Sequence, residues 1–251
     1  MSAPSPKDGS AGDGVRDTLL GPDEGLFETM RAEGGRVPLL DRHLARMRRS
    51  AEALGLDAVP GAGALGAEVA AALAGAGAGP HRVRLTALAS GAVRVEVVPL
   101  DPDPDPTAIT LPGWWDPGAA IREHKTTRYA HFRRAVEEAR ARGAGHALLL
   151  DAAGRPGEAA TASLVLVVAG RAVTPPVQGI LAGVARGVLV EAGLVGEELV
   201  GADALAEAEE VVAVNALRGA MPVLVVDGRP VGDARPGPVA ARLRRALAEA
   251  A

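Results

Sequence analysis

The run Asp101-Pro102-Asp103-Pro104-Asp105-Pro106 constrains the fold of this chain more than any other segment. Proline lacks a backbone N–H and fixes φ, so prolines at alternate positions exclude both a helix and an inner strand. Such a composition is typical of an extended linker. We therefore predict two domains, residues 21–104 and 105–251. Residues 1–20 carry no periodic pattern, and we expect them to form a disordered tail.

Strand and helix patterns occur in both halves, which favours an α+β fold. Residues 82–88 and 93–98 alternate and are joined by Ser90-Gly91, which predicts a hairpin. Apolar residues at helical spacing predict a helix over 42–54, with Asp41 as its N-cap. Further strands are predicted at 25–31, 36–40, 108–111, 147–151, 163–168, 171–174, 210–214 and 223–226, and further helices at 64–74, 129–142, 183–192 and 236–250.

The composition excludes several classes of protein. The formal net charge is -4, which does not favour a nucleic-acid partner. The chain has no cysteine, so it has no disulfide framework and no thiol nucleophile. No histidines fall at the spacing of a metal motif, and we expect no metal site. No signal peptide or membrane span is evident, so we expect a cytoplasmic protein with no membrane partner.

Lysine is nearly absent from this chain. Of 27 Lys and Arg residues only two, Lys7 and Lys125, are lysines. In a chain rich in alanine, glycine and arginine, a lysine that carries only surface charge can be replaced by arginine. An amine that must lose its proton cannot be replaced in this way, because a guanidinium stays charged. Lys125, in the body of the chain, is therefore a candidate for chemistry, with chance survival as the alternative.

The surroundings of Lys125 favour bonding to an aldehyde cofactor. Thr126, Thr127 and Tyr129 follow it, just before a predicted helix, which suits an amine held in place and neutral. The alternative is that the threonines only cap the helix. Pyridoxal phosphate also needs a phosphate site, an acid at the ring nitrogen and a donor near the ring hydroxyl. The candidates are Arg46, the start of the helix over 183–192, Glu158 and Tyr129.

The order of several blocks resembles the class IV aminotransferases. The resemblance covers about residues 24–230. The blocks are Leu26-Phe27-Glu28-Thr29-Met30-Arg31, Leu40-Asp41-Arg42-His43-Leu44-Ala45-Arg46-Met47, His124-Lys125-Thr126-Thr127, Gly154-Arg155-Pro156-Gly157-Glu158-Ala159-Ala160-Thr161, Thr174-Pro175-Pro176 and Gly179-Ile180-Leu181-Ala182-Gly183-Val184.

The resemblance implies a mixed α/β fold like that of D-amino acid aminotransferase, with the pyridoxal phosphate between two domains, and a homodimer. It implies that Lys125 bonds to the cofactor and that Glu158 pairs with the pyridine nitrogen. It places Tyr129 near the ring hydroxyl. The phosphate would be held by Arg46 and by the backbone amides of Val184 and Ala185.

The resemblance also narrows the activity. Residues 214–223 read N-A-L-x-G-x-x-P-V from Asn215, which resembles aminodeoxychorismate lyase and implies formation of 4-aminobenzoate and pyruvate. A branched-chain or D-amino acid aminotransferase and a non-catalytic relative are the alternatives. Thr29, Asn215 and Arg218 are the candidate substrate-binding residues.

Two positions depart from the family pattern. The family's L-P-G-x-T-R block reads Leu181-Ala-Gly-Val-Ala-Arg186 here, so a threonine hydroxyl for the phosphate is missing at Ala185. Arg128 stands where the lyases often have asparagine.

Overall fold

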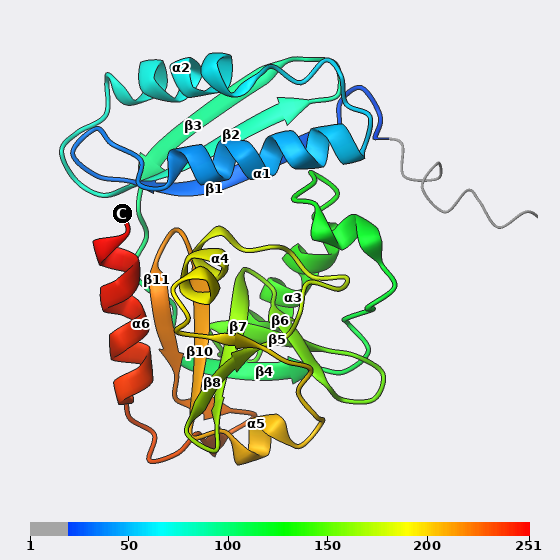
Figure 1. The fold of residues 1–251 in the computed structure, drawn as a ribbon, viewed down its shortest axis with the longest axis vertical. Coiled ribbons are helices and arrows are strands. Elements are labelled where there is room, and N and C mark those ends of the chain that lie inside the picture. The colour runs from blue at the N-terminus through cyan, green and yellow to red at the C-terminus, as the bar shows by residue number, and fades with distance from the viewer. Residues whose placement is uncertain (1–19) are drawn as a thin grey trace, which may run out of the picture.

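The computed structural model describes residues 20–251, so the predicted tail lies outside the described residues except for Leu20. The described chain forms two sheets, one above the other in Figure 1. The first sheet has the order β1-β2-β3 and is antiparallel throughout. Its hairpin, β2 and β3, lies where the alternating pattern predicts it. The helices and strands together confirm the predicted mixed α/β fold.

The second sheet is larger and mixed. Its order is β11-β10-β7-β6-β5-β4-β12-β13, and β8 pairs with β7 and with β9. β4 runs parallel to both β5 and β12, whereas the other neighbours along the main path are antiparallel.

The bounds of the elements are as follows. The strands are β1 Gly25–Ala32, β2 His81–Leu88, β3 Val93–Pro99, β4 Thr107–Leu111, β5 His146–Leu150, β6 Pro156–Ala159, β7 Ala162–Val168, β8 Arg171–Thr174, β9 Gly196–Glu197, β10 Glu210–Asn215, β11 Gly219–Val223, β12 Val225–Val226 and β13 Arg229–Pro230. The helices are α1 Leu40–Ala53, α2 Ala62–Leu73, the 3₁₀ turn η2 Ala120–Glu123, α3 Ala130–Ala141, α4 Val184–Glu191, α5 Ala204–Glu207 and α6 Pro238–Glu249.

Helices α1 and α2 cover one face of the first sheet (Figure 1). Alternation along β1 and β2 directs Met30 and Leu85 to that face, where they share a buried cluster with Leu44 and Met47 of α1. Burying one such side chain contributes about 1.5–3 kcal/mol. The opposite face of the sheet, which carries Phe27 and its alternate neighbours, is therefore free to line a site between the two sheets.

Residues 100–106 connect β3 to β4 and form no helix or strand, as the Asp-Pro run predicts. The connection is tied to the second sheet by Arg218, which donates hydrogen bonds to the Asp101 carbonyl and to Asp103 Oδ1, both at 2.9 Å. The division into domains at residue 104 stays a prediction.

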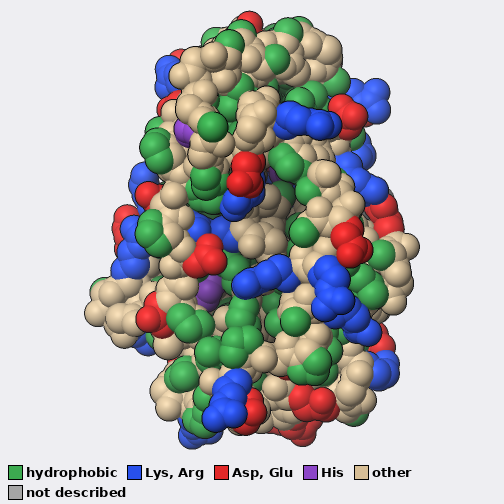
Figure 2. All heavy atoms as spheres, turned by 90° about the vertical axis from the view of Figure 1, so that its left-hand side faces the viewer, with side chains coloured by type: hydrophobic (Ala, Val, Ile, Leu, Met, Phe, Trp, Pro, Cys, Tyr) green, Lys and Arg blue, Asp and Glu red, His purple; other side chains and the backbone are tan. Residues whose placement is uncertain are grey.

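The surface carries charges of both signs. On the face shown in Figure 2, acidic and basic side chains are interspersed rather than gathered by sign. Within residues 20–251, no helix has both the length and the apolar composition needed to cross a bilayer.

Two predictions around α1 are wrong. The helix begins at Leu40 after Leu39, whose φ is 57°, so Asp41 lies in the first turn and is not the N-cap. Its carboxylate still lies near the positive end of the helix dipole. The strand predicted at 36–40 is reduced to one bridge, Glu33↔Arg36. Pro38 has no N–H for a ladder, and the helix has started by Leu40.

In the second half of the chain, the sequence pattern does not predict all of the short strands. β6 is absent from the prediction because four residues that begin with Pro156 are too few to show alternation. The strand predicted at 223–226 is divided at Leu224. β11 pairs with β10, whereas β12 pairs with β4. One apolar run of the sequence therefore forms two strands that have different neighbours in the sheet.

Candidate active site

A cavity of about 850 Å³ lies between the two sheets and is lined by residues from both. The sequence-predicted site residues line it with one exception. Ala185 is not among the lining residues, and its side chain is buried in the core beside Leu189. The predicted residues that the cavity brings together are Thr29, Arg46, Lys125, Tyr129, Glu158, Val184, Asn215 and Arg218.

Lys125 is held against the edge of β1 by the backbone. The Phe27 amide donates to the Lys125 carbonyl at 2.9 Å, and the Thr127 amide donates to the Gly25 carbonyl at 2.8 Å. These bonds form a bridge from the first sheet to the chain that leads into α3. The Lys125 ammonium nitrogen then lies 4.6 Å from the centre of the Phe27 ring. The lysine thus enters the cavity from a backbone fixed at both ends.

Arg128 contributes to this attachment. Its guanidinium donates to both carboxylate oxygens of Glu24, at 2.9 and 2.8 Å. Glu24 directly precedes β1, so the ion pair joins the two segments that the Lys125 bridge also joins. The arginine that departs from the family pattern therefore has a structural contact in this chain.

The pKa of Lys125 is lowered to about 8. Burial is the main cause, and the positive charge of Arg46 adds to it, while Glu28 and Glu158 oppose the shift. A larger fraction of this amine is therefore neutral near physiological pH than of an exposed lysine. A neutral amine is what both a nucleophile and a proton acceptor require.

Glu158 is the buried acid of the cavity. It lies on β6, its side chain is 5% exposed, and its Oε2 accepts from the Leu181 amide at 3.3 Å. Burial raises the pKa of Glu158 to about 8 against the opposing effects of the Leu181 hydrogen bond and Lys125. Among the described residues, no basic side chain forms a hydrogen bond with it. The carboxyl can therefore receive a cationic partner from a ligand.

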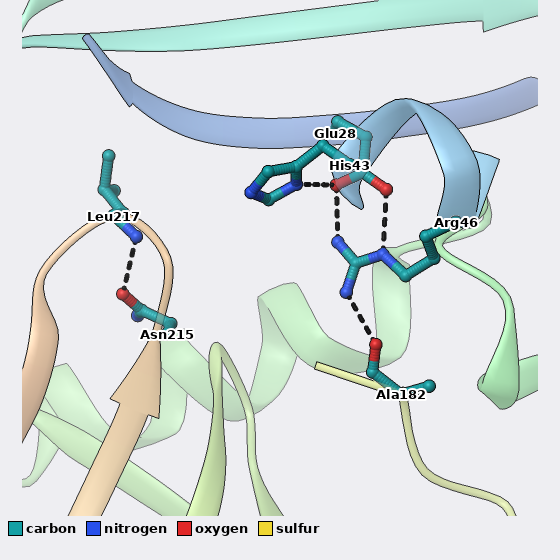
Figure 3. Close-up of polar contacts among 6 residues, drawn as sticks. All are labelled: Glu28, His43, Arg46, Ala182, Asn215 and Leu217. Carbon is teal, nitrogen blue, oxygen red and sulfur yellow. Dashed lines mark hydrogen bonds and ion pairs between the residues drawn. The ribbon is translucent and has the colours of Figure 1, made fainter. Parts of the chain in front are cut away.

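Arg46 is held by a buried carboxylate, as Figure 3 shows. Its guanidinium donates from Nε to Glu28 Oε1 at 2.8 Å and from Nη2 to Glu28 Oε2 at 2.5 Å. His43 Nδ1 lies 2.7 Å from the same Oε2. Burial favours the neutral acid, but Arg46 and His43 together lower the pKa of Glu28 to about 2. Arg46 is thus fixed in place as a permanent cation.

The remaining Arg46 nitrogen, Nη1, donates to the Ala182 carbonyl at 3.0 Å (Figure 3). Ala182 directly precedes Gly183, the N-cap of α4. The first-turn amides of a helix have no partner within it, and the dipole is positive there. A guanidinium beside a helix N-terminus suits a phosphate. Arg186 of the same helix does not join this site, because it donates to the Pro175 carbonyl and to Glu197.

Tyr129 lies between aromatic neighbours. Its ring makes an edge contact with Phe27 at 5.3 Å and stacks on Phe132 at 5.0 Å. The hydroxyl donates to the Ala160 carbonyl at 2.9 Å. Burial, with Glu158 nearby, raises the pKa of Tyr129 to about 12, so the phenol stays protonated. A phenol that donates in this way can still accept a hydrogen bond from a ligand.

Asn215 shapes the turn between β10 and β11. Its Oδ1 accepts from the Leu217 amide at 3.0 Å (Figure 3) and from the Arg218 amide at 2.8 Å. Its Nδ2 donates to the Thr161 carbonyl. Asn215 therefore holds the cavity wall in shape. One nitrogen of Arg218, Nη1, donates hydrogen bonds to the Asp101 carbonyl and to Asp103 Oδ1 in the connection between β3 and β4. The third candidate for substrate binding, Thr29, is the cross-strand partner of Arg84.

Sequence reasoning missed His43 and Arg84, which line the cavity, and Glu28, which does not line it but holds Arg46. The guanidinium of Arg84 lies 3.8 Å from the centre of the Phe27 ring, on the same cavity wall as Lys125. Glu28 could have been found from the sequence, because it lies at an alternate position of the predicted strand between the apolar residues Leu26 and Met30, and all three are buried. An acid on an apolar face needs a buried cation.

Comparisons with known proteins give a family and several similar folds. Residues 25–226 match the family model for amino-transferase class IV. No match is found among curated protein sequences. A branched-chain aminotransferase from Thermoproteus uzoniensis, solved with norvaline, is 25% identical, with 90% of this chain and 84% of that chain covered and a TM-score of 0.78.

Two further solved structures are similar in fold. A hypothetical aminotransferase from Mycobacterium tuberculosis, with α-ketoglutarate and pyridoxamine phosphate bound, is 24% identical, covers 92% of this chain and 93% of that chain, and has a TM-score of 0.78. A protein provisionally named 4-amino-4-deoxychorismate lyase from Legionella pneumophila is 21% identical, with 92% of each chain covered and a TM-score of 0.79.

Proposed function

We propose, since the chain belongs to the class IV aminotransferase family of pyridoxal phosphate enzymes, that it is a 4-amino-4-deoxychorismate lyase giving 4-aminobenzoate and pyruvate. One observation carries the choice of lyase. The lyase-like segment from Asn215 is the turn whose Leu217 and Arg218 line the same cavity as Lys125. This location supports a role of the segment in selecting the substrate.

The cavity fits the family's cofactor at three points. Glu158 is a buried carboxyl without a cationic hydrogen-bond partner among the described residues, which suits a protonated ring nitrogen. Arg46 and the start of α4 suit the phosphate. Lys125 offers an amine of lowered pKa for the aldehyde. A cavity of about 850 Å³ also has room for a substrate beside the cofactor.

When bound, pyridoxal phosphate supplies an aldehyde that bonds to amines and a ring that withdraws electrons. Lys125 would hold the aldehyde and, when free, would take a proton from the substrate. Glu158 would hold the proton on the ring nitrogen. Tyr129 would supply a hydroxyl beside the ring. In a transaminase Lys125 would instead return the proton to the aldehyde carbon of the cofactor, so both candidates need the same lysine.

Basic side chains of β2 that line the cavity support an anionic substrate. Arg82 and Arg84 lie on the cavity face of β2, and Arg82 Nε is buried without a hydrogen-bond partner in the part of the chain that the structure describes. Aminodeoxychorismate carries two carboxylates, and arginine pairs with carboxylates through parallel hydrogen bonds. Dicarboxylate amino acids would suit these residues too. The second candidate is therefore a transaminase, which the likeness to a branched-chain aminotransferase also favours.

The resemblance to the family also leads us to propose a homodimer. Its mass in solution, measured by light scattering, should be about twice that of the 25.4 kDa chain.

Two measurements test the proposed function. Purified protein given pyridoxal phosphate should develop a near-visible absorbance band, and the Lys125→Ala variant should not. No band in the wild type would mean a non-catalytic relative. Aminodeoxychorismate is then supplied, and 4-aminobenzoate is measured. Amino transfer from an amino acid to a keto acid, without formation of 4-aminobenzoate, would show that the enzyme is a transaminase and not a lyase.

A further inference from the structure

The Ser163 side chain is largely buried, and its hydroxyl is accessible from the cavity. Ser163 lies on β7, is 6% exposed and lines the cavity. Within residues 20–251 its hydroxyl forms no hydrogen bond. A hydroxyl that opens onto a cavity and has no partner within the described residues is free to donate to a ligand bound there.

This hydroxyl lies against the N-terminus of α4. A Cβ placed on Gly183, the N-cap, would come within 2.4 Å of Ser163 Oγ. Gly183 has φ -62° and ψ 131°, which any residue can adopt, so this position needs glycine for space and not for conformation. The close approach brings the Ser163 hydroxyl beside the unpaired amides at the start of the helix.

The other groups of the proposed phosphate site surround the same point. Arg46 reaches the Ala182 carbonyl, one residue before Gly183, at 3.0 Å. Ser163 is also the direct cross-strand partner of Glu158, so both side chains emerge on the same face of the sheet. Ser163 is therefore a neighbour both of the proposed partner of the ring nitrogen and of the start of α4.

We propose that the Ser163 hydroxyl donates a hydrogen bond to the cofactor phosphate. It would replace the threonine hydroxyl that the family pattern has at Ala185 and this chain lacks. The inference rests on the proposed placement of the phosphate between Arg46 and α4. A hydrogen bond from a neutral hydroxyl to a phosphate dianion is charge-assisted and therefore stronger than one between neutral groups.

The test compares two ligands that differ only in the phosphate, pyridoxamine 5'-phosphate and pyridoxamine. Neither carries an aldehyde, so neither bonds to Lys125, and calorimetry gives the affinity of each. Wild-type protein should prefer the phosphorylated ligand. In Ser163→Ala this preference should fall by about tenfold or more, while the affinity for pyridoxamine is kept.

Ser50→Ala is the matched control. It removes another buried serine hydroxyl, which contacts His124 Nδ1 at 3.0 Å and does not line the cavity. Its preference for the phosphorylated ligand should equal that of the wild type. Gly183→Ala tests the same contact from the other side, because the new methyl group forces the Ser163 hydroxyl to rotate away. Adding Ser163→Ala to Gly183→Ala should then cause no further fall in preference.

The possible failures can be told apart. If Ser163→Ala weakens both ligands equally or leaves the preference unchanged, the role of Ser163 is wrong while the phosphate site stands. If wild-type protein binds both ligands equally well, the placement of the phosphate is wrong, and the inference fails with it. An equal fall in preference in Ser50→Ala would also overturn the inference.

Discussion

The carboxylate of Glu28 binds the guanidinium of Arg46 through two hydrogen bonds, at 2.8 and 2.5 Å, in a site where Glu28 is 1% exposed. Removing one partner of a buried ion pair leaves the other charge uncompensated. We expect Glu28→Gln to lower the free energy of unfolding of the cofactor-free protein by about 3 kcal/mol at pH 7. Urea unfolding measures this directly.

The pH dependence of the Glu28 variant follows from the same pair. The pKa of Glu28 is about 2 in the folded protein, below its ordinary 4.5. Its stabilising effect is complete above pH 4.5 and is lost as the pH falls towards 2. The gap between wild type and variant should therefore shrink in acid. Glu33→Gln, which breaks only an exposed pair with Arg31, should cost at most about 0.5 kcal/mol. Equal costs at both sites would contradict this account.

Lys125 should destabilise the cofactor-free protein at neutral pH. Its pKa is lowered from 10.5 to about 8, mainly by burial and further by Arg46. The folded state therefore releases the proton first, and stability rises as the pH goes from about 8 to 10.5. Lys125→Met, which keeps an unbranched side chain, should be more stable than the wild type at pH 7 and should lose this advantage by pH 10.5.

Urea unfolding across this pH range measures the effect of Lys125. Arg49→Met removes an exposed cation from α1 and serves as the control, because its effect should not change over the same range. A Lys125→Met variant that is less stable than the wild type at pH 7 would show that the buried ammonium is stabilised, and the account of the lowered pKa would be wrong.

Lys125→Arg should be as inactive as Lys125→Ala. A guanidinium keeps the charge but cannot bond to the aldehyde or give up its proton near neutral pH. Formation of product and the near-visible absorbance band should both be lost. Lys7→Ala removes the only other lysine and should keep both. Normal activity in the arginine variant would refute the chemical role of Lys125.

Lys125 could be predicted because its signals are local: a rare residue type, flanked by hydroxyls, in a block that resembles a family. Its attachment to β1 could not. The backbone bonds to Phe27 and Gly25 join segments about a hundred residues apart, and no periodicity in either segment records that pairing. The same limit hid the roles of Glu28 and His43, which act through a contact between β1 and α1.

Local signals also failed where a strand was short or changed neighbours. Glu158 was predicted as a site residue, but its strand was not, because β6 has four residues and its partners come from β5 and β7. The close contacts that position Glu158 are tertiary as well. The adjacent Gly157 is one of them, since a Cβ on it would lie 2.4 Å from the indole of Trp115.

Gly157→Ala should therefore disturb Glu158. The methyl group would overlap the Trp115 ring, and overpacking of this kind costs about 1–3 kcal/mol. We expect lower stability in urea and weaker binding of pyridoxal phosphate, followed by its absorbance. Gly63→Ala is the control, because nothing lies within 4 Å of its added Cβ on α2, and alanine there should stabilise the protein by about 0.5–1 kcal/mol. Unchanged cofactor binding in Gly157→Ala would show that β6 tolerates the shift.

Glu158→Gln should stabilise the cofactor-free protein and disable the enzyme. Burial raises the pKa of Glu158 from 4.5 to about 8, although the Leu181 amide opposes this shift. The folded state thus holds the proton longer than the unfolded state, and stability falls as the pH rises from 4.5 to about 8. Glutamine carries no charge, so the stability of the variant does not fall in this way as the pH rises. The variant should match the wild type in urea at pH 4.5 and exceed it at pH 8.

With pyridoxal phosphate present, the effect of Glu158→Gln should reverse. An amide cannot hold a proton on the ring nitrogen, so the ring withdraws fewer electrons and product formation should fall by about 10²-fold or more. Comparing unfolding of the cofactor-free protein with the rate of the loaded enzyme separates the two effects. A variant that is both unchanged in stability at pH 8 and fully active would show that Glu158 neither bears a raised pKa nor meets the ring nitrogen.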